Sequence, residues 1–459
     1  MKPLRKQGII LFTILALIMV ACGGSDTAEE TVEATPEVVE TLDSPAVTTA
    51  STVDTGVGVT SDPCPEVIGG IPTGADPSKG CIYLGLLNDY TGPFGPYGIP
   101  LETGQRGFWL WANQTGGVGD YSVAIVEGYD TQYNPQKHLE GYKAQRGEVA
   151  ALAMSLGTPQ TQFILDDMDA DNMIAAPMSW YSGWSYKGSD RGLVVEFGAA
   201  YCADGMNALD WAMANLPVDI KTVGVMGYAG DYGGDYAAGV TAAAEANGIT
   251  VAWEYIVPSS EFDVAQAVGL MVTKPVDAYF PAIGPTFMAQ VAGGAFQQGL
   301  TPIAMMAAPS YNDAFTAEGF ALAPLFQPGS MYLMAFVAPY EAQTPGHAAM
   351  RATLQAMGVD SGNLFLTAGW ASQHHLKGVL EAAVKGGDLT RAGIRRAAAN
   401  VSVSSDGMMP TRELGQDRAD AESFIGIPDE SQTSGIRLLS GNYVGPTAAG
   451  YDWEAGPCS

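Results

Sequence analysis

Short apolar runs alternate with helix-like segments along most of the chain. Apolar runs typical of buried strands lie at residues 82–87, 150–156, 172–176, 193–197, 222–226, 250–255, 278–281, 302–306 and 330–336. Amphipathic spacing between them predicts helices, for example over residues 236–247 and 287–298. An alternation of this kind is typical of parallel sheets covered by helices on both faces.

After residue 336 the pattern becomes mainly helical, over residues 347–357, 364–383 and 389–400. Roughly 380 residues follow residue 79 of the 459-residue chain, which is more than one hydrophobic core usually holds. We therefore predict an α/β protein with two lobes, each a mainly parallel sheet flanked by helices.

The beginning of the chain has the pattern of an export signal. Basic residues precede an apolar stretch over residues 8–21 that is too short to span a bilayer comfortably. The stretch ends at Cys22 in a sequence that resembles the lipobox of bacterial lipoproteins, with Met19 where Leu is usual. We predict that residues 1–21 are a signal peptide and that Cys22 becomes lipidated. The alternative is an ordinary secretory signal that is cut near Ala21.

Residues 23–60 have the composition of a tether. They are rich in Thr, Val, Ala, Pro and Gly, and they carry acidic side chains but no Lys or Arg. Such a segment repels itself and has few large apolar groups to bury. We predict that residues 22–79 are a disordered acidic tether with the segment that leads into the folded domain. The domain then lies outside the cytoplasm, in the periplasm or at the cell surface, held to the membrane by its lipid alone.

The acidity of the chain excludes one class of partner. Its formal net charge is −28 at pH 7, and no part of the sequence forms a basic face. Nucleic acid binding depends on basic groups that release phosphate counterions. We therefore predict no nucleic acid partner and no docking on an anionic membrane apart from the lipid.

Four cysteines follow Cys22, at Cys64, Cys81, Cys202 and Cys458. An even number in an exported chain predicts two disulfides, for which three connectivities exist. The pairing that we consider first is Cys64 with Cys81, which would staple the start of the domain. Cys202 with Cys458 would then hold the C-terminus.

No catalytic or metal-binding motif is found in the sequence. G-x-S-x-G, H-E-x-x-H and a P-loop ending in G-K-[ST] are all missing, and the Gly-rich run at residues 227–234 lacks the G-x-G-x-x-G spacing. His374 and His375 are adjacent, so their side chains point apart on a helix and chelate poorly. We predict no enzymatic activity, no cofactor and no metal.

The turn at residues 89–98 is a candidate binding edge. It follows the first apolar run, is rich in Gly and Pro, carries Phe94 and Tyr97, and leads into a helix. Open α/β sheets bind ligands just beyond the carboxyl ends of their strands. Tyr97 is therefore a candidate ligand contact, although a plain surface turn gives the same pattern.

Ordered motifs from this turn onward resemble those of a known family. Residues 91–98 match a T-G-P-x-x-x-Y-G opening, and residues 129–135 contain a D-x-x-x-x-P segment. Residues 113–119 are similar to an N-x-x-G-G-v-x-G turn. Asp231-Tyr232-Gly233 is similar to the start of a helix in the second lobe. Over residues 80–445 the chain resembles the type I periplasmic binding proteins, in the leucine/isoleucine/valine-binding branch that serves ABC importers.

The resemblance implies a clamshell with a hinge of three crossing segments. One lobe would hold residues 80–200 and 331–434, and the other residues 201–330 and 435–459. Ligand would favour the closed arrangement because it binds that state more tightly. The implied function is a monomeric extracytoplasmic substrate-binding lipoprotein that delivers a small polar ligand to an ABC permease and ATPase complex. The alternative is a sensory lipoprotein that reports ligand to a membrane receptor.

In this branch a hydroxyl residue after the third strand binds the carboxylate of the ligand. Thr158 matches that position here, and Gln160 lies two residues later. Thr158 as a simple helix N-cap is the alternative. The next ligand loop carries Ser179, Trp180 and Tyr181, and Trp180 replaces the Thr of the amino-acid binders. That replacement puts an α-amino acid in doubt. It favours an aromatic wall for a flat ligand or a quaternary cation, unless the rings only pack on neighbouring helices.

From the other lobe, Tyr232 occupies the position of a cleft-facing Tyr. The acid that pairs with a ligand ammonium in the family has Ser310 in its position here, with Asp313 three residues later. If Asp313 takes over that role, the ligand is a charged amine, and otherwise an amide or a neutral compound. The expected ligand is a branched-chain amino acid, an amide or an aromatic derivative.

Overall fold

The computed structural model describes residues 53–326 and 329–459, which belong to one compact unit. The predicted signal peptide, the predicted lipidation site Cys22 and most of the predicted tether lie outside the described residues. Across the described part of the chain, no helix is long and apolar enough to cross a membrane.

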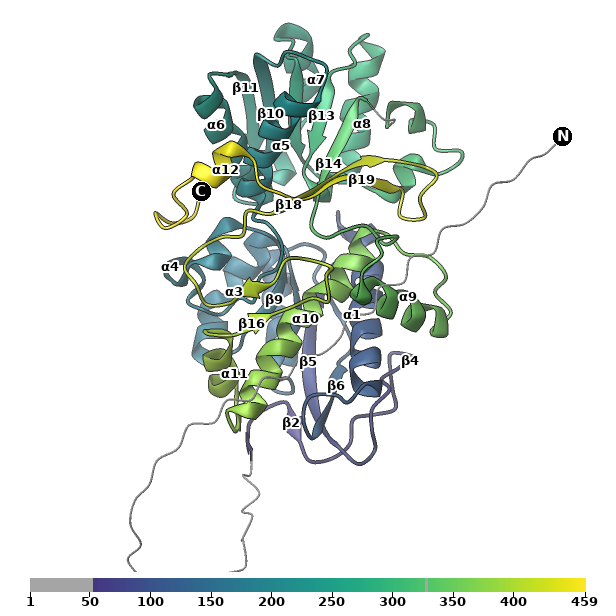
Figure 1. Cartoon of the computed structure of the whole chain (residues 1–459), viewed down its shortest axis with the longest axis vertical. Helices are drawn as coiled ribbons and strands as arrows, with labels where there is room; N and C mark the ends of the chain where they lie inside the picture. Colours follow the sequence, from purple (N-terminus) through teal and green to yellow (C-terminus); the bar gives the residue numbers. More distant parts are fainter. Residues whose placement is uncertain (1–52, 327–328) are drawn as a thin grey trace, which may run out of the picture. The chain divides into compact units, whose positions relative to one another are not determined.

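The first sheet is built around strand β5 (Gly80–Asn88), in the lower lobe of Figure 1. Two strands run parallel to it, β8 (Ala151–Leu156) on one side and β6 (Tyr121–Ile125) on the other. Strand β8 is buried along its whole length, as expected for a strand covered on both faces. The other strands and the connecting helices are β7 (Tyr129–Asp130), β9 (Ala175–Met178), α1 (Gly95–Gln114), α2 (Pro135–Gln145) and α3 (Thr158–Asp171).

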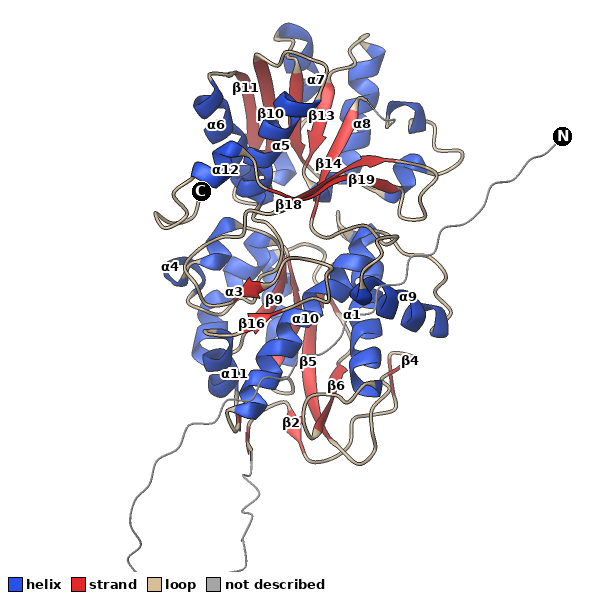
Figure 2. Ribbon diagram, in the orientation of Figure 1, coloured by secondary structure: helices blue, strands red, loops and turns tan. Residues whose placement is uncertain are grey.

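The second sheet has seven strands in the order β11-β10-β12-β13-β14-β18-β19, flanked by helices as Figure 2 shows. The first five are parallel, and β18 and β19 are antiparallel at one edge. The strands are β10 (Thr222–Tyr228), β11 (Thr250–Val257), β12 (Ala278–Ala282), β13 (Ile303–Met306), β14 (Met331–Ala335), β18 (Ser423–Pro428) and β19 (Ile436–Tyr443). The helices are α5 (Tyr201–Asn215), α6 (Tyr232–Asn247), α7 (Val264–Thr273) and α8 (Pro285–Gln297).

This architecture confirms the predicted fold class, and most predicted strands are present. The apolar run at residues 193–197 is the exception, because it forms only a single bridge, between Val194 and Ala175 of β9. The run is buried against the edge of the first sheet, so its apolar composition reflects burial without a strand ladder. The predicted strand at residues 172–176 begins later than expected, at Ala175.

The predicted lobe boundaries are corrected at both ends of residues 331–434. Strand β14 pairs with β13, and β18 pairs with β14, so both belong to the second sheet. Only the helical segment between them returns to the first lobe. The chain therefore passes between the lobes three times, before α5, after β14 and before β18.

Part of the predicted tether is also corrected. Strand β2 (Val59–Thr60) pairs with β5, and β1 (Asp54–Thr55) pairs with β15 (Asp388–Leu389). Val59 lies half-buried beside the first strand, so the apolar side chains of this segment contribute to the edge of the fold. Residues 53–60 are therefore part of the folded unit.

Helix α10 (Leu364–Lys385) returns to the first lobe and lies against α1. The two backbones approach closely at two glycines. A Cβ at Gly104 would lie 2.1 Å from the carbonyl oxygen of Leu366, and a Cβ at Gly369 would lie 2.2 Å from that of Leu101. This close crossing places the start of α10 beside the start of α1. The shorter elements that complete the first lobe are α4 (Lys187–Asp190), α9 (Pro345–Ala356), α11 (Arg391–Ala398), β3 (Val67–Ile68), β4 (Ile71–Pro72), β16 (Ser402–Val403) and β17 (Arg412–Glu413).

Two disulfides are present, Cys64–Cys81 and Cys202–Cys458. They match the pairing that was considered first among the three connectivities. The second joins α5 to the end of the chain, which follows the short helix α12 (Pro446–Gly450).

Replacing both cysteines of the Cys202–Cys458 disulfide by serine should lower the free energy of unfolding more than replacing those of Cys64–Cys81. The two bonds join residues 256 and 17 positions apart, and closing a longer loop removes more entropy from the unfolded chain. The expected losses are roughly 5 and roughly 3 kcal/mol. Denaturant titration of the two double variants measures both. A larger loss for C64S/C81S would contradict the expectation.

Candidate ligand-binding site

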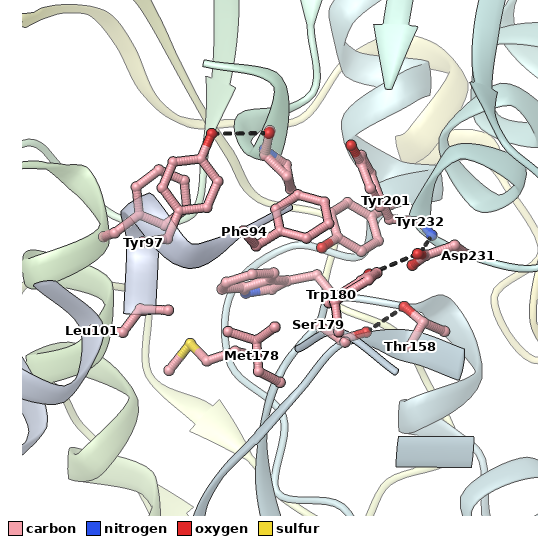
Figure 3. Close-up of a pocket in the computed structure, with 15 residues that line it drawn as sticks. Phe94, Tyr97, Leu101, Thr158, Met178, Ser179, Trp180, Tyr201, Asp231 and Tyr232 are labelled. Carbon is pink, nitrogen blue, oxygen red and sulfur yellow. Dashed lines mark hydrogen bonds between the residues drawn. The ribbon is translucent and has the colours of Figure 1, made fainter. Parts of the chain in front are cut away.

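A pocket lies between the two lobes at the carboxyl ends of strands from both sheets (Figure 3). The free volume of the cavity between its walls is about 40 Å³. Open α/β sheets place their ligand sites at this edge. The lining residues are Phe94, Tyr97, Leu101, Tyr133, Leu156, Gly157, Thr158, Met178, Ser179, Trp180, Tyr201, Asp231, Tyr232, Pro309 and Phe365.

The structure brings five of the predicted site residues together in this pocket: Tyr97, Thr158, Ser179, Trp180 and Tyr232. Each lies just after a strand, in the turn or in the first turn of the next helix. Their side chains are all buried. Contact with a ligand stays a prediction for each of them.

Four other predicted residues do not line the pocket. The hydroxyl of Ser310 donates to the carbonyl of Pro281 and accepts from the amide of Ile283, at 3.1 Å each. Asp313 is half-buried at the start of a 3-10 turn outside the pocket. The last two residues have contacts outside the pocket lining. The side-chain amide of Gln160 donates to the carbonyl of Tyr133, and the hydroxyl of Tyr181 donates to the main-chain carbonyl of Ser459.

Tyr97 connects the lobes across the pocket. Its hydroxyl lies 2.9 Å from the carbonyl oxygen of Tyr311 and 3.2 Å from that of Pro309, both in the second lobe. Its ring stacks on Phe365 at the start of α10, with centroids 3.7 Å apart. Burial raises the pKa of the phenol well above its ordinary value, so the hydroxyl remains a hydrogen-bond donor at any physiological pH.

Trp180 is both a wall of the pocket and a packing residue. Its ring stacks on Phe336, with centroids 3.4 Å apart and planes at 5°, and it meets Tyr201 edge-on. Trp184 does not line the pocket, because its indole N–H donates to the hydroxyl of Ser179 from behind the loop. Of the aromatic residues of this loop, only Trp180 therefore lines the pocket, and rings from other elements supplement it.

Two hydroxyls form the polar edge of the first lobe. Thr158 and Ser179 lie 2.6 Å apart, oxygen to oxygen. Thr158 is not the helix N-cap, because that position of α3 is Gly157 at φ +100°. A side chain there would meet Gln160 and Tyr133, so glycine is required both by the backbone and by the space.

Asp231 faces the hydroxyls from the second lobe. It is the N-cap of α6, and its carboxylate accepts from the amide of Tyr232 at 2.7 Å and from the hydroxyl of Tyr133 at 2.6 Å. Burial raises its pKa to about 6, against the lowering effect of these hydrogen bonds. Sequence reasoning missed Asp231 as a site residue, because capping a helix explains an Asp at this position equally well.

The other missed residues are mainly aromatic. The rings of Phe94 and Tyr133 are tilted by 53° with centroids 4.4 Å apart, and the ring of Tyr201 lies 5.4 Å from that of Tyr232. Phe94 follows the first strand as Tyr97 does. The rule that residues just after a parallel strand lie at the binding edge would therefore have found it. Tyr201 reaches the pocket at the end of a segment that crosses between the lobes, and Phe365 reaches it from the start of α10. No local pattern marks such positions.

The chemistry of the pocket is apolar and aromatic with one polar corner. Among the residues that the structure describes, no Lys, Arg or His lines it, and no group of three His, Cys, Asp or Glu is placed to hold a metal ion. An arrangement of this kind suits an organic ligand whose body meets ring faces and methyl groups and whose polar group meets the corner formed by Thr158, Ser179 and Asp231.

Comparisons with known proteins agree with this geometry. A family model described as periplasmic binding protein matches residues 81–423. A fatty acid ABC transporter substrate-binding protein from Thermomonospora curvata is 25% identical, with a TM-score of 0.76 over 87% of this chain and 97% of its own. A comparison with curated proteins gave no match.

Two more distant structures share the fold. A branched-chain amino acid ABC transporter from Thermus thermophilus with bound valine is 14% identical, with a TM-score of 0.66 over 80% of this chain and 98% of its own. A solute-binding protein from R. palustris in complex with 4-hydroxybenzoate is 13% identical, with a TM-score of 0.63 over 80% and 98%.

Gly233 and Gly234 give a matched test of how the pocket is positioned. A Cβ at Gly233 would lie 2.1 Å from the backbone nitrogen of Tyr228, whereas a Cβ at Gly234 meets nothing within 4 Å. G233A should push α6 away from β10 and lower the free energy of unfolding by about 2 kcal/mol or more. G234A should raise it by roughly 0.4–1 kcal/mol, because alanine restricts the unfolded chain. Denaturant titration compares them, and equal effects would contradict the close packing.

Proposed function

The chain belongs to the periplasmic binding protein family, and we propose that it captures a small organic ligand outside the cytoplasm and delivers it to an ABC importer. The observation that carries the proposal is the pocket itself. Residues of both lobes line it, and hydrogen bonds from Tyr97 to the Tyr311 carbonyl and from Tyr133 to Asp231 cross it. A ligand that contacts both lobes binds the closed state more tightly and so stabilises it.

The ligand that we propose has an aromatic or branched apolar body and one polar head. Of the classes expected from the sequence, an aromatic derivative fits the lining best, because seven aromatic residues line the pocket. A branched-chain amino acid or an amide uses the same polar corner. The named solved relatives bind a fatty acid, valine and 4-hydroxybenzoate, and all three have an apolar or aromatic body.

We further propose that the protein works as a monomer anchored through lipid on Cys22, with an ABC permease and ATPase complex as its partner. The acidic segment after Cys22 is long enough to let the folded unit reach a permease in the same membrane. The sensory role uses the same pocket and differs only in the partner, a receptor instead of a permease. No enzymatic step is part of the proposal.

A thermal-shift screen of the full chain against small aromatic acids, amines, amides and branched-chain amino acids tests this function. A compound present at about 100 times its Kd should stabilise the protein by about 2.7 kcal/mol. Stabilisation by none of these classes would contradict the proposal.

Two conservative variants test the role of Trp180. Trp180 and Trp370 are both buried, and each has an indole N–H without a hydrogen-bond partner, but only Trp180 lines the pocket. W180F should weaken binding of the best compound from the screen at least about threefold, since a smaller ring covers less of the ligand. W370F should leave that affinity unchanged. Isothermal titration measures both, and equal affinities for the two variants would exclude Trp180 as a ligand contact.

A further inference from the structure

Asp231 is the one carboxylate among the described residues that line the pocket, and no basic side chain of the described chain accompanies it there. It belongs to α6 in the second lobe, at the corner where Thr158 and Ser179 of the first lobe also lie. Any charged group that enters the pocket therefore meets a single acid. A ligand anion would face that acid without a counter-charge.

The carboxylate has hydrogen-bonding capacity left over. It accepts two hydrogen bonds, from the Tyr232 amide on one oxygen and from the Tyr133 hydroxyl on the other. An ionised carboxylate offers about four acceptor positions. The hydroxyl of Thr158 also acts on this carboxylate as a hydrogen-bond donor, so at least one position remains for a further donor. The Tyr133 bond comes from the opposite lobe, so the closed arrangement completes this corner.

Aromatic rings surround the same corner. Phe94 lies 4.4 Å from Tyr133 and 6.2 Å from Tyr232, and Trp180 lies 5.9 Å from Tyr201, measured between ring centroids. The faces of such rings attract cations. In addition, the hydroxyl of Tyr232 is buried and has no hydrogen-bond partner in the structure. A buried hydroxyl without a partner in a pocket lining points to a ligand atom that would complete it.

We propose that the ligand carries a protonated amine, which binds the carboxylate of Asp231 inside this ring of aromatic side chains. The inference rests on the proposed function and makes it more specific. The acid differs from those expected on sequence grounds, because Ser310 and Asp313 do not line the pocket. It comes instead from the N-cap of α6, on the element that also carries Tyr232.

The titration of the corner supports the same assignment. The groups that face Asp231 are Thr158 and the phenols of Tyr133, Tyr201, Tyr228 and Tyr232, and burial raises the pKa of each phenol. The pKa of Asp231, raised by burial, is about 6, so it is the group of this corner that changes charge near neutral pH. A bound amine needs the carboxylate ionised, so its affinity falls as the pH drops below that value. A ligand carboxylate would show the opposite trend.

The test uses three probes that share a phenyl ring and a two-carbon linker: phenethylamine, 3-phenylpropionamide and 3-phenylpropionate. Their heads are cationic, neutral and anionic, and their bodies have nearly the same size. Each is titrated into the full chain by isothermal calorimetry at pH 7.5 and at pH 5. We expect the amine to bind at least tenfold more tightly than the carboxylate at pH 7.5, and to lose about tenfold at pH 5.

D231N and D313N give the matched pair of variants. Asparagine still accepts from the amide of Tyr232, so the cap of α6 is kept in D231N while the charge is lost. D231N should weaken the amine at least tenfold, remove its pH dependence and leave the amide within about threefold. D313N should leave all three affinities unchanged, because Asp313 lies outside the pocket.

The outcomes separate this inference from the function on which it rests. Tightest binding by the carboxylate or the amide would overturn the amine assignment and leave a ligand-binding protein in place. Unchanged amine affinity in D231N would overturn the role of Asp231. Binding by none of the three probes would also overturn the inference, while the wider screen decides the function.

Discussion

The hydrogen bond from the Tyr97 phenol to the carbonyl of Tyr311 is the contact on which the arrangement of the pocket depends. The phenol is buried, so it has no water to replace a lost partner, and an unpaired buried hydroxyl is costly. Tyr97 is held in place from its own lobe by stacking on Phe365, and the close crossing of α1 and α10 at Gly104 brings that residue to it. Opening the lobes would therefore break a contact that the first lobe has already positioned.

The fold could be predicted from sequence wherever local pattern and tertiary role agree. Buried parallel strands have short apolar runs in the sequence. Runs as short as those of β11, with eight residues, or β10, with seven, are enough to predict a strand. The hydrophobic pattern predicted the wrong structure where a segment is buried without forming a strand, or is folded without being apolar. Residues 193–197 are apolar because they cover a sheet edge, and residues 53–60 belong to the fold through backbone pairing that composition does not reveal.

About half of the candidate site could be predicted from sequence. The rule that loops after parallel strands form the binding edge located Tyr97, and the resemblance to the periplasmic binding proteins located Trp180 and Tyr232. The resemblance also indicated Ser310, which does not line the pocket because a 3-10 turn directs its hydroxyl back to the sheet. It also missed Asp231, whose local role as a helix cap conceals its place in the pocket. Which side chain of a loop faces the ligand depends on turn geometry, and a single sequence does not specify it.

The central claim is that ligand closes two lobes that share one pocket. The most direct measurement is the distance between spin labels on Phe163 of α3 and Phe296 of α8, which are exposed in different lobes. Labels on F163C/F296C are followed by pulsed electron resonance with and without the best compound from the screen. The account predicts a broad distribution without ligand and a single narrow one with it. The same distribution in both states would contradict closure by ligand.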